Sequence, residues 1–211
     1  MRNCKAIVLF ITTLAQTLHN AGLVVSTAPQ FVSLGGAINP AVPGNTVGFS
    51  SGGVANQYGE AISAGYVDYV QLQVYNQAQD VFVDGTTITQ VQSYSLFNQT
   101  INAMRSANCG SNQFCVPNST IVLLGVPVNA GAAGTSIWGD LSQRSSSIYT
   151  STLASLVSET ANLINGTNNS GNFNGFMTWS LNNDYYSSFY QAAGSSSPGQ
   201  TSQALNQALG I

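Results

Sequence analysis

Val67-Asp-Tyr-Val-Gln-Leu-Gln-Val-Tyr-Asn76 is the stretch that decides the fold of this 211-residue chain. Its β-branched, aromatic and aliphatic residues are typical of a β-strand. Successive side chains of a strand point to opposite faces, so Gln71, Gln73 and Tyr75 share one face and place three hydrogen-bonding groups on it. Two interpretations follow: a solvated face of an edge strand, or a strand whose polar end is directed at a binding site.

Strand and helix patterns alternate through the rest of the chain. Apolar runs predict three further strands, at Leu23 to Gln30, Ser119 to Val128 and Asn172 to Leu181. Helices are predicted at Val54 to Ala64, Gln90 to Ser106, Ser142 to Ile164 and Pro198 to Leu209. The connections are Phe31 to Gly53 and Ala78 to Thr89. Strands that alternate with helices predict parallel βαβ units, and so an α/β fold in a single domain over residues 1 to 211.

The chain is unusually poor in charge. Charged residues make up 5% of it, against about 25% in an average globular protein. Four lysine and arginine residues stand against seven aspartate and glutamate residues, which leaves no basic patch able to neutralise phosphates. Nucleic acid is therefore not an expected partner. Serine, threonine, asparagine, glutamine and glycine take the place of charge, and such a surface suits an uncharged, hydroxyl-rich ligand such as a polysaccharide.

Three cysteines bear on the redox environment and on metal binding. Cys109 and Cys115 bracket a short loop between a helical pattern and a strand, a closure well suited to a disulfide, and Cys4 is left over. The only histidine, His19, is far from that pair in sequence. We therefore expect no metal site and no cofactor.

Four sequence triplets have the form of N-glycosylation acceptors, at Asn98, Asn118, Asn165 and Asn168. A chain rich in asparagine and serine also produces such triplets by chance. Together with the cysteine pair they favour a secreted, extracellular protein.

The segment Met1 to Ala21 has two interpretations. Arg2 and Lys5 followed by an apolar run resemble the start of a signal peptide, which is too short to span a bilayer, so no membrane association is expected. The alternative is a helix, because Phe10, Leu14 and neighbouring apolar residues recur at helical spacing. The helix is favoured, since cleavage after Ala15 would leave barely a turn before Leu23.

Four segments resemble the C-terminal half of a glycoside hydrolase family 18 chitinase of the fungal and plant class III type. Asp68 to Asn76 resembles strand six of the (β/α)8 barrel of that family. The other matches, in the same order and at similar spacing, are Ala28-Pro29-Gln30 with strand five, Leu124 to Pro127 and Ala130 to Gly134 with strand seven and its loop, and Gly175 to Ser180 with strand eight. The resemblance implies a partial (β/α)8 TIM barrel, about strands five to eight, in a truncated domain.

The resemblance also implies a ligand and a site. The parent activity is endo-hydrolysis of β-1,4-linked N-acetylglucosamine polymers, so chitin or its oligosaccharides are the expected partners. Tyr75 matches the tyrosine that hydrogen-bonds the N-acetyl group of the substrate, and Gln73 and Asn76 match polar residues beside it. Trp179 matches the aromatic floor of the sugar site, although an indole can also simply fill a core. Asp68 begins its strand and is expected to be structural.

The catalytic acid of the family has no match in this sequence. Family 18 enzymes use the acetamido oxygen of the substrate as nucleophile and take a proton from the glutamate of an Asp-x-x-Asp-x-Asp-x-Glu motif on strand four. No two of the seven acidic residues here lie within three positions of one another. Asp184 is the only acid expected near the mouth of the barrel, and no family pattern supports it as a replacement. The chain is therefore expected to be inactive, and a carbohydrate-binding lectin-like protein or a non-functional fragment is the alternative.

The number of strands bears on assembly. A barrel of this type closes with eight strands, and the sequence predicts four. Two open sheet edges and little net charge predict self-association through the barrel edges, or aggregation.

Overall fold

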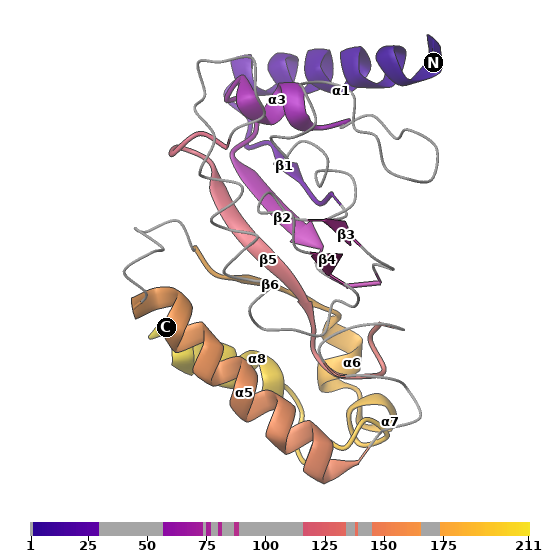
Figure 1. Ribbon diagram of the computed structural model, residues 1–211, viewed down its shortest axis with the longest axis vertical. Coiled ribbons are helices and arrows are strands. Elements are labelled where there is room, and N and C mark those ends of the chain that lie inside the picture. Colours follow the sequence, from indigo (N-terminus) through magenta and orange to yellow (C-terminus); the bar gives the residue numbers. More distant parts are fainter. Residues whose placement is uncertain are drawn as a thin grey trace.

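Four parallel strands form the sheet at the centre of the molecule (Figure 1). The computed structural model describes residues 2–29, 57–73, 75–76, 80–81, 87–88, 116–133, 138, 145–165 and 174–211. Within them the strand order is β1-β2-β5-β6, with every pairing parallel. The strands are β1 (Ser26–Thr27), β2 (Tyr69–Gln73), β5 (Ile121–Pro127) and β6 (Phe176–Trp179). The predicted α/β fold with a parallel sheet is thereby confirmed.

Helices lie toward both ends of the sheet in Figure 1. α1 (Arg2–Asn20) packs with α3 (Gly59–Ser63) at one end, and α5 (Ser146–Asn165) packs with α8 (Gln200–Leu209) at the other. The short helices α6 (Leu181–Tyr185) and α7 (Ser187–Tyr190) follow β6. In the part of the chain that the structure describes, no helix is both long and apolar enough to cross a membrane.

The core lies between one face of the sheet and the helices. Val70 and Leu72 of β2 are fully buried, while Tyr69, Gln71 and Gln73 are only half-buried, as the two-residue period of a strand requires. The same apolar cluster holds residues of β5 and of α3, α5 and α8, among them Val122, Leu124, Ile62, Leu156 and Leu205. Gln71 and Gln73 therefore lie on the opposite face of β2, away from these helices.

Several predicted boundaries are wrong. The strand predicted from Leu23 to Gln30 is reduced to β1, and Leu23 and Val24 are exposed instead of buried, because β1 is an edge strand that pairs at only two positions. The predicted connection Ala78 to Thr89 contains a small antiparallel pair, β3 (Asp80–Val81) with β4 (Thr87–Ile88). Sequence patterns missed α6 and α7. The predicted helix Gln90 to Ser106 and the predicted connection Phe31 to Gly53 lie outside the described residues.

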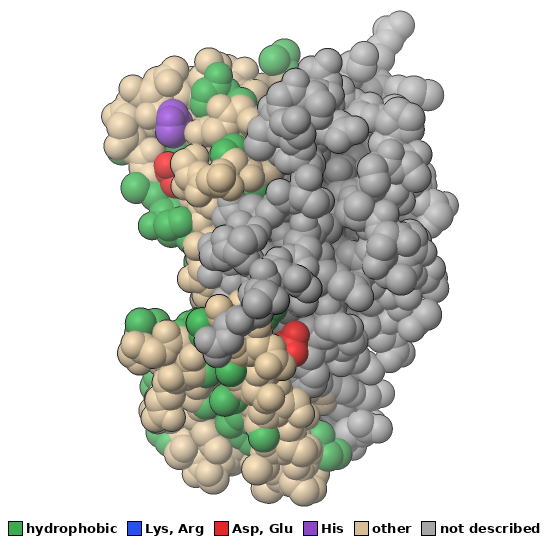
Figure 2. Space-filling model, turned by 60° about the vertical axis from the view of Figure 1, so that its left-hand side comes forward, with side chains coloured by type: hydrophobic (Ala, Val, Ile, Leu, Met, Phe, Trp, Pro, Cys, Tyr) green, Lys and Arg blue, Asp and Glu red, His purple; other side chains and the backbone are tan. Residues whose placement is uncertain are grey.

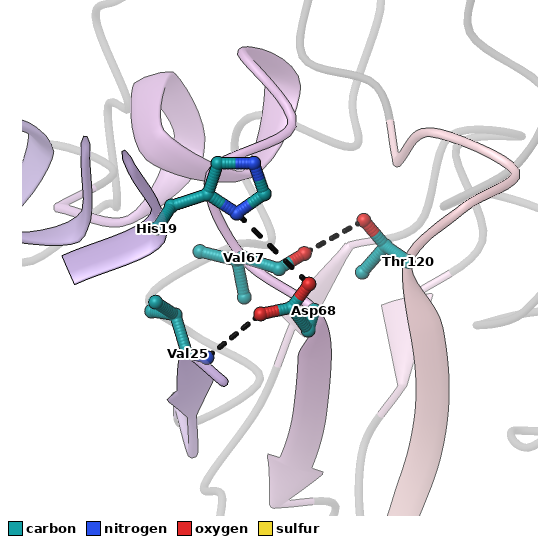
Figure 3. Close-up of polar contacts among 5 residues, drawn as sticks. All are labelled: His19, Val25, Val67, Asp68 and Thr120. Atoms are coloured by element: carbon teal, nitrogen blue, oxygen red, sulfur yellow. Dashed lines mark hydrogen bonds and ion pairs between the residues drawn. The ribbon is translucent and has the colours of Figure 1, made fainter. Parts of the chain in front are cut away.

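Asp68 connects chain segments at the N-terminal ends of the strands (Figure 3). Its carboxylate accepts a hydrogen bond of 2.7 Å from the backbone N–H of Val25, and His19 lies 4.0 Å from its other oxygen. The hydroxyl of Thr120 donates to the carbonyl of Val67 beside it. These bonds join the end of α1 and the starts of β2 and β5, which confirms the structural role expected for Asp68.

Candidate functional site

Near the C-terminal ends of β2, β5 and β6, one residue from each strand lies side by side in a row across the sheet. Gln73 of β2 pairs with Gly125 of β5, and Gly125 pairs with Met177 of β6. Gln73 and Gly125 follow the core residues Leu72 and Leu124, so the row lies on the face opposite the core. Trp179 is two residues beyond Met177 and shares that face. The C-terminal edge of a parallel sheet is where α/β barrels place their sites.

Gly125 lets neighbouring groups approach closely in the middle of this row. A Cβ atom there would lie 2.8 Å from the terminal methyl of Met177 and 2.9 Å from the carbonyl oxygen of Leu72. The second contact is with backbone, which cannot rotate away. The sequence contained a signal for this position, since a glycine inside a strand pattern often marks a close approach of another group. Sequence reasoning placed Gly125 only within a motif and missed its role.

The two glutamines of β2 bind the neighbouring strand. The side-chain amide of Gln73 donates to the carbonyl of Ala28 at 2.8 Å, and the amide of Gln71 donates to the hydroxyl of Ser26 at 2.9 Å. β2 lies between β1 and β5, so the interpretation of this stretch as an edge strand is wrong. Both hydrogen bonds use the side-chain nitrogen of the glutamine and not its side-chain oxygen.

Tyr75 and Asn76 follow directly at the end of β2. Only 5% of Tyr75 is exposed, and this burial raises the pKa of its hydroxyl, which keeps it protonated and able to donate a hydrogen bond. Asn76 is exposed and has a φ of 56°, a left-handed conformation that asparagine tolerates better than most residues. The predicted site residues Gln73, Tyr75 and Asn76 are thus grouped at one strand end.

The two tryptophans have different roles. Trp179 ends β6 and is 49% exposed, so the core-filling alternative for it is wrong. Trp138 is the core indole: it is 3% exposed, donates its N–H to the carbonyl of Pro127 at 2.5 Å and stacks on Tyr149 with 5.1 Å between ring centroids. Trp179 therefore presents an aromatic surface at the same edge as Gln73.

Asp184 is not available at the mouth of the site. It is 1% exposed, and its carboxylate accepts hydrogen bonds from the backbone N–H groups of Thr201 at 3.4 Å and Ser202 at 3.1 Å and from the Ser202 hydroxyl at 2.6 Å. Those N–H groups belong to the first turn of α8, whose unpaired donors and positive dipole end attract a carboxylate. Asp184 caps this helix.

The other described acids lie on other elements. Asp68 lies at the N-terminal ends of the strands, Glu60 and Glu159 lie on α3 and α5, and Asp80 lies on β3. Within the described residues, no group of three histidine, cysteine, aspartate or glutamate side chains is arranged to hold a metal ion.

The predictions about covalent modification fall mainly on other parts of the chain. Cys109, Cys115, Asn98 and Asn168 lie outside the described residues. Asn118 is exposed in the turn before β5, and Asn165 is the last residue of α5. The disulfide and the glycosylation sites stay predictions.

Comparison with known proteins supplies a match in structure only. No protein-family profile matches the sequence, and no curated protein sequence matches it. A family GH18 chitinase from Chromobacterium violaceum superposes with a TM-score of 0.59 at 16% identity, covering 97% of this chain and 50% of the chitinase. A GH18 chitinase from Pseudoalteromonas aurantia gives a TM-score of 0.51 at 16% identity, covering 94% and 54%.

At this identity the likeness is one of fold, and the chain spans about half the length of the chitinases it matches. The four short motifs and the independent superposition therefore point to the same kind of fold. The fold of this chain is similar to about half of the fold of a glycoside hydrolase family 18 chitinase.

Proposed function

We propose that this chain is a chitinase-like carbohydrate-binding protein, whose sheet corresponds to strands five to eight of a (β/α)8 barrel. The ligand is a β-1,4-linked N-acetylglucosamine oligosaccharide, bound at the C-terminal edge of β2, β5 and β6. The observation that carries the proposal is the half-exposed indole of Trp179, on the same face as the row of Gln73, Gly125 and Met177. The fold likeness to two chitinases supports it.

The chemistry of these side chains fits such a ligand. An exposed indole offers a flat apolar surface to the C–H face of a sugar ring. By the family resemblance, Tyr75, which stays protonated, corresponds to the tyrosine that donates to the acetamido carbonyl, and Gln73 and Asn76 correspond to polar residues beside it.

We further propose that the 211-residue polypeptide binds this ligand without hydrolysing it. General acid catalysis supplies about 10²–10⁴-fold in rate, and the leaving oxygen of a glycoside needs that proton. The family motif that carries the acid is not in the sequence, and Asp184 is engaged in capping α8. Parent-type endo-hydrolysis would need a carboxylic acid that reaches the glycosidic oxygen.

A pull-down on chitin beads tests binding. Wild type is expected to bind and Trp179→Ala to bind at least several-fold less. Phe10→Ala is the matched control, because Phe10 is an exposed aromatic residue on α1 and its loss should change nothing. Equal binding by wild type and Trp179→Ala would show that the indole is not part of a sugar site.

A fluorogenic chitooligosaccharide tests hydrolysis on the same preparations. No turnover above buffer is expected. Turnover that disappears in Asp184→Asn, in a variant shown to be folded, would contradict the binding-only proposal.

Self-association is the third part of the proposal. β1 and β6 are the edge strands of the described sheet, and an unpaired strand edge is a template for pairing with another chain. We expect size-exclusion chromatography with light scattering to find dimers or larger species. A monodisperse monomer of 22.0 kDa with a sharp thermal transition would contradict this part alone.

A further inference from the structure

A second group of exposed aromatic rings follows the candidate site in sequence. Tyr185, Tyr186 and Phe189, here called the aromatic shelf, lie on and between α6 and α7, just beyond β6. All three are exposed, Tyr186 most of all at 67%. The rings of Tyr186 and Phe189 lie 6.1 Å apart between centroids, tilted by 40°. Exposed aromatic groups of this kind mark interaction surfaces.

Tyr185 is supported from behind by backbone. A Cβ atom at Gly199 would lie only 2.6 Å from the ring carbon and the hydroxyl oxygen at the end of Tyr185. The hydroxyl end of the ring therefore rests on the glycine, and 47% of the residue is exposed. Gly199 has a φ of 69°, so its left-handed conformation and its missing side chain both suit this position.

The segment that carries the shelf is anchored to α8. The backbone N–H of Gly199 donates to the carbonyl of Asp184 at 2.7 Å, while the Asp184 carboxylate caps the helix. On the other side, the side-chain amide of Asn129, at the end of β5, donates to the carbonyl of Asn183 at 2.7 Å. These bonds hold the backbone of the shelf in place relative to β5 and α8, so that this backbone is already ordered before a ligand binds.

This part of the chain has little charge with which to bind a charged ligand. Residues 174–211 contain one charged side chain, Asp184, and it is buried. Their other polar groups are hydroxyls and amides, supplied by serine, asparagine and glutamine. On the face drawn in Figure 2, green hydrophobic side chains lie among uncharged tan groups, together with red acidic side chains. An uncharged ligand with apolar faces and many hydroxyls matches this composition.

We infer that the aromatic shelf is a second binding surface for the same polysaccharide, which holds sugar units beyond those at Trp179. The inference rests on the proposed function, since it needs an N-acetylglucosamine chain seated at the indole. Stacking on rings, with hydroxyl and amide groups around them, supplies the contact. The shelf then makes binding depend on the length of the oligosaccharide.

Isothermal titration with N-acetylglucosamine oligomers of two to six units tests this on the full chain. The double variant Tyr186→Leu and Phe189→Leu keeps apolar area but removes the aromatic faces. Its affinity for the hexamer is expected to fall by about threefold to tenfold per ring, and its affinity for the dimer to stay unchanged. Phe10→Leu removes an exposed aromatic ring on α1, outside the shelf, and should bind as wild type does. Thermal melts of these surface variants confirm that they fold.

The outcomes separate the two claims. If the leucine variant binds the hexamer as wild type does while Trp179→Ala loses binding at every length, the shelf is overturned and the proposed function stands. If wild type binds no oligomer, the proposed function itself falls, and the shelf with it. If the leucine substitutions instead convert an oligomer into a monomer in light scattering, the shelf contacts a second copy of the chain, and the polysaccharide surface is overturned.

Discussion

The hydroxyl of Ser202 donates a 2.6 Å hydrogen bond to the carboxylate of Asp184, across 18 positions of sequence. This bond joins the segment after β6 to the first turn of α8. Asp184, the one acid that the sequence places near the mouth of the site, therefore has a structural role. The chemistry proposed for the chain depends on this assignment.

Asp184→Asn should therefore weaken the fold. An asparagine has one acceptor oxygen where the aspartate has two, so it cannot accept from the N–H groups of both Thr201 and Ser202 in the same way. The free energy of unfolding is expected to fall by about 1–2 kcal/mol, as for the loss of a helix cap. Urea unfolding measures it. Glu159→Gln, on the surface of α5, is the control and should unfold like wild type; an unchanged midpoint for Asp184→Asn would refute the capping role.

Gly125→Ala should damage both the sheet and the site. The added methyl group meets the backbone carbonyl of Leu72 as well as the flexible end of Met177. Overpacking of this kind costs about 1–3 kcal/mol. Thermal unfolding of the variant checks the cost. The double variant with Met177→Ala should recover only part of it, because the Leu72 carbonyl stays; full recovery would mean that Met177 alone limits the space.

Asp68→Ala should lower stability and leave sugar binding intact. The carboxylate loses its bond to the N–H of Val25, at the edge of the sheet opposite the site. A loss of about 1 kcal/mol is expected for a partly exposed group. His19→Gln is the companion variant: the histidine is also partly exposed and lies 4.0 Å from Asp68, so a smaller effect is expected in the same urea titration. A larger loss of stability from His19→Gln than from Asp68→Ala would show that the bond from Asp68 to Val25 is not the main stabilising contact here.

Tyr149 should make the fold sensitive to alkaline pH. Burial raises the pKa of its hydroxyl above the ordinary 10.0, the charge of Asp184 adds to this, and the side-chain hydrogen bonds with Thr201 and Ser195 oppose it. The unfolded chain then ionises first, so stability is complete below pH 10 and falls as the pH rises toward the folded-state pKa. Unfolding midpoints at neutral pH and at about pH 11 measure the fall.

Tyr149→Phe should reduce that fall without removing it, because the raised pKa of Tyr75 acts in the same direction. At neutral pH the variant also loses the 2.7 Å bond to Thr201, which is worth about 1 kcal/mol. If wild type and Tyr149→Phe lose equal stability between neutral pH and about pH 11, ionisation of Tyr149 does not cause the loss.

The parallel sheet was predictable because its central strands combine apolar runs with glycine or proline at their ends. Ile121 to Pro127 is such a run, and it is almost wholly buried between its neighbours. The ends of β1 were not predictable. Leu23 and Val24 have the composition of buried strand residues, but burial depends on which helix or strand covers them, and composition does not contain that information.

The site was predictable in its residue types and not in its contacts. Sequence placed Trp179 and Tyr75 at strand ends, yet it could not tell that Trp138 fills the core while Trp179 is open, since the partners of Trp138 come from β5 and α5. Asp184 was misplaced for the same reason. Its partners lie 17 and 18 positions later, and only the packing of α8 brings them together.

Intrinsic fluorescence during titration with a soluble N-acetylglucosamine hexamer tests the central claim most directly. The chain contains two tryptophans, and only Trp179 is exposed. A saturable change in emission is predicted for wild type, and none for Trp179→Phe, which keeps Trp138 as its only indole. An unchanged wild-type emission at saturating hexamer, or an equal change in Trp179→Phe, would contradict a sugar site at the C-terminal edge of the sheet.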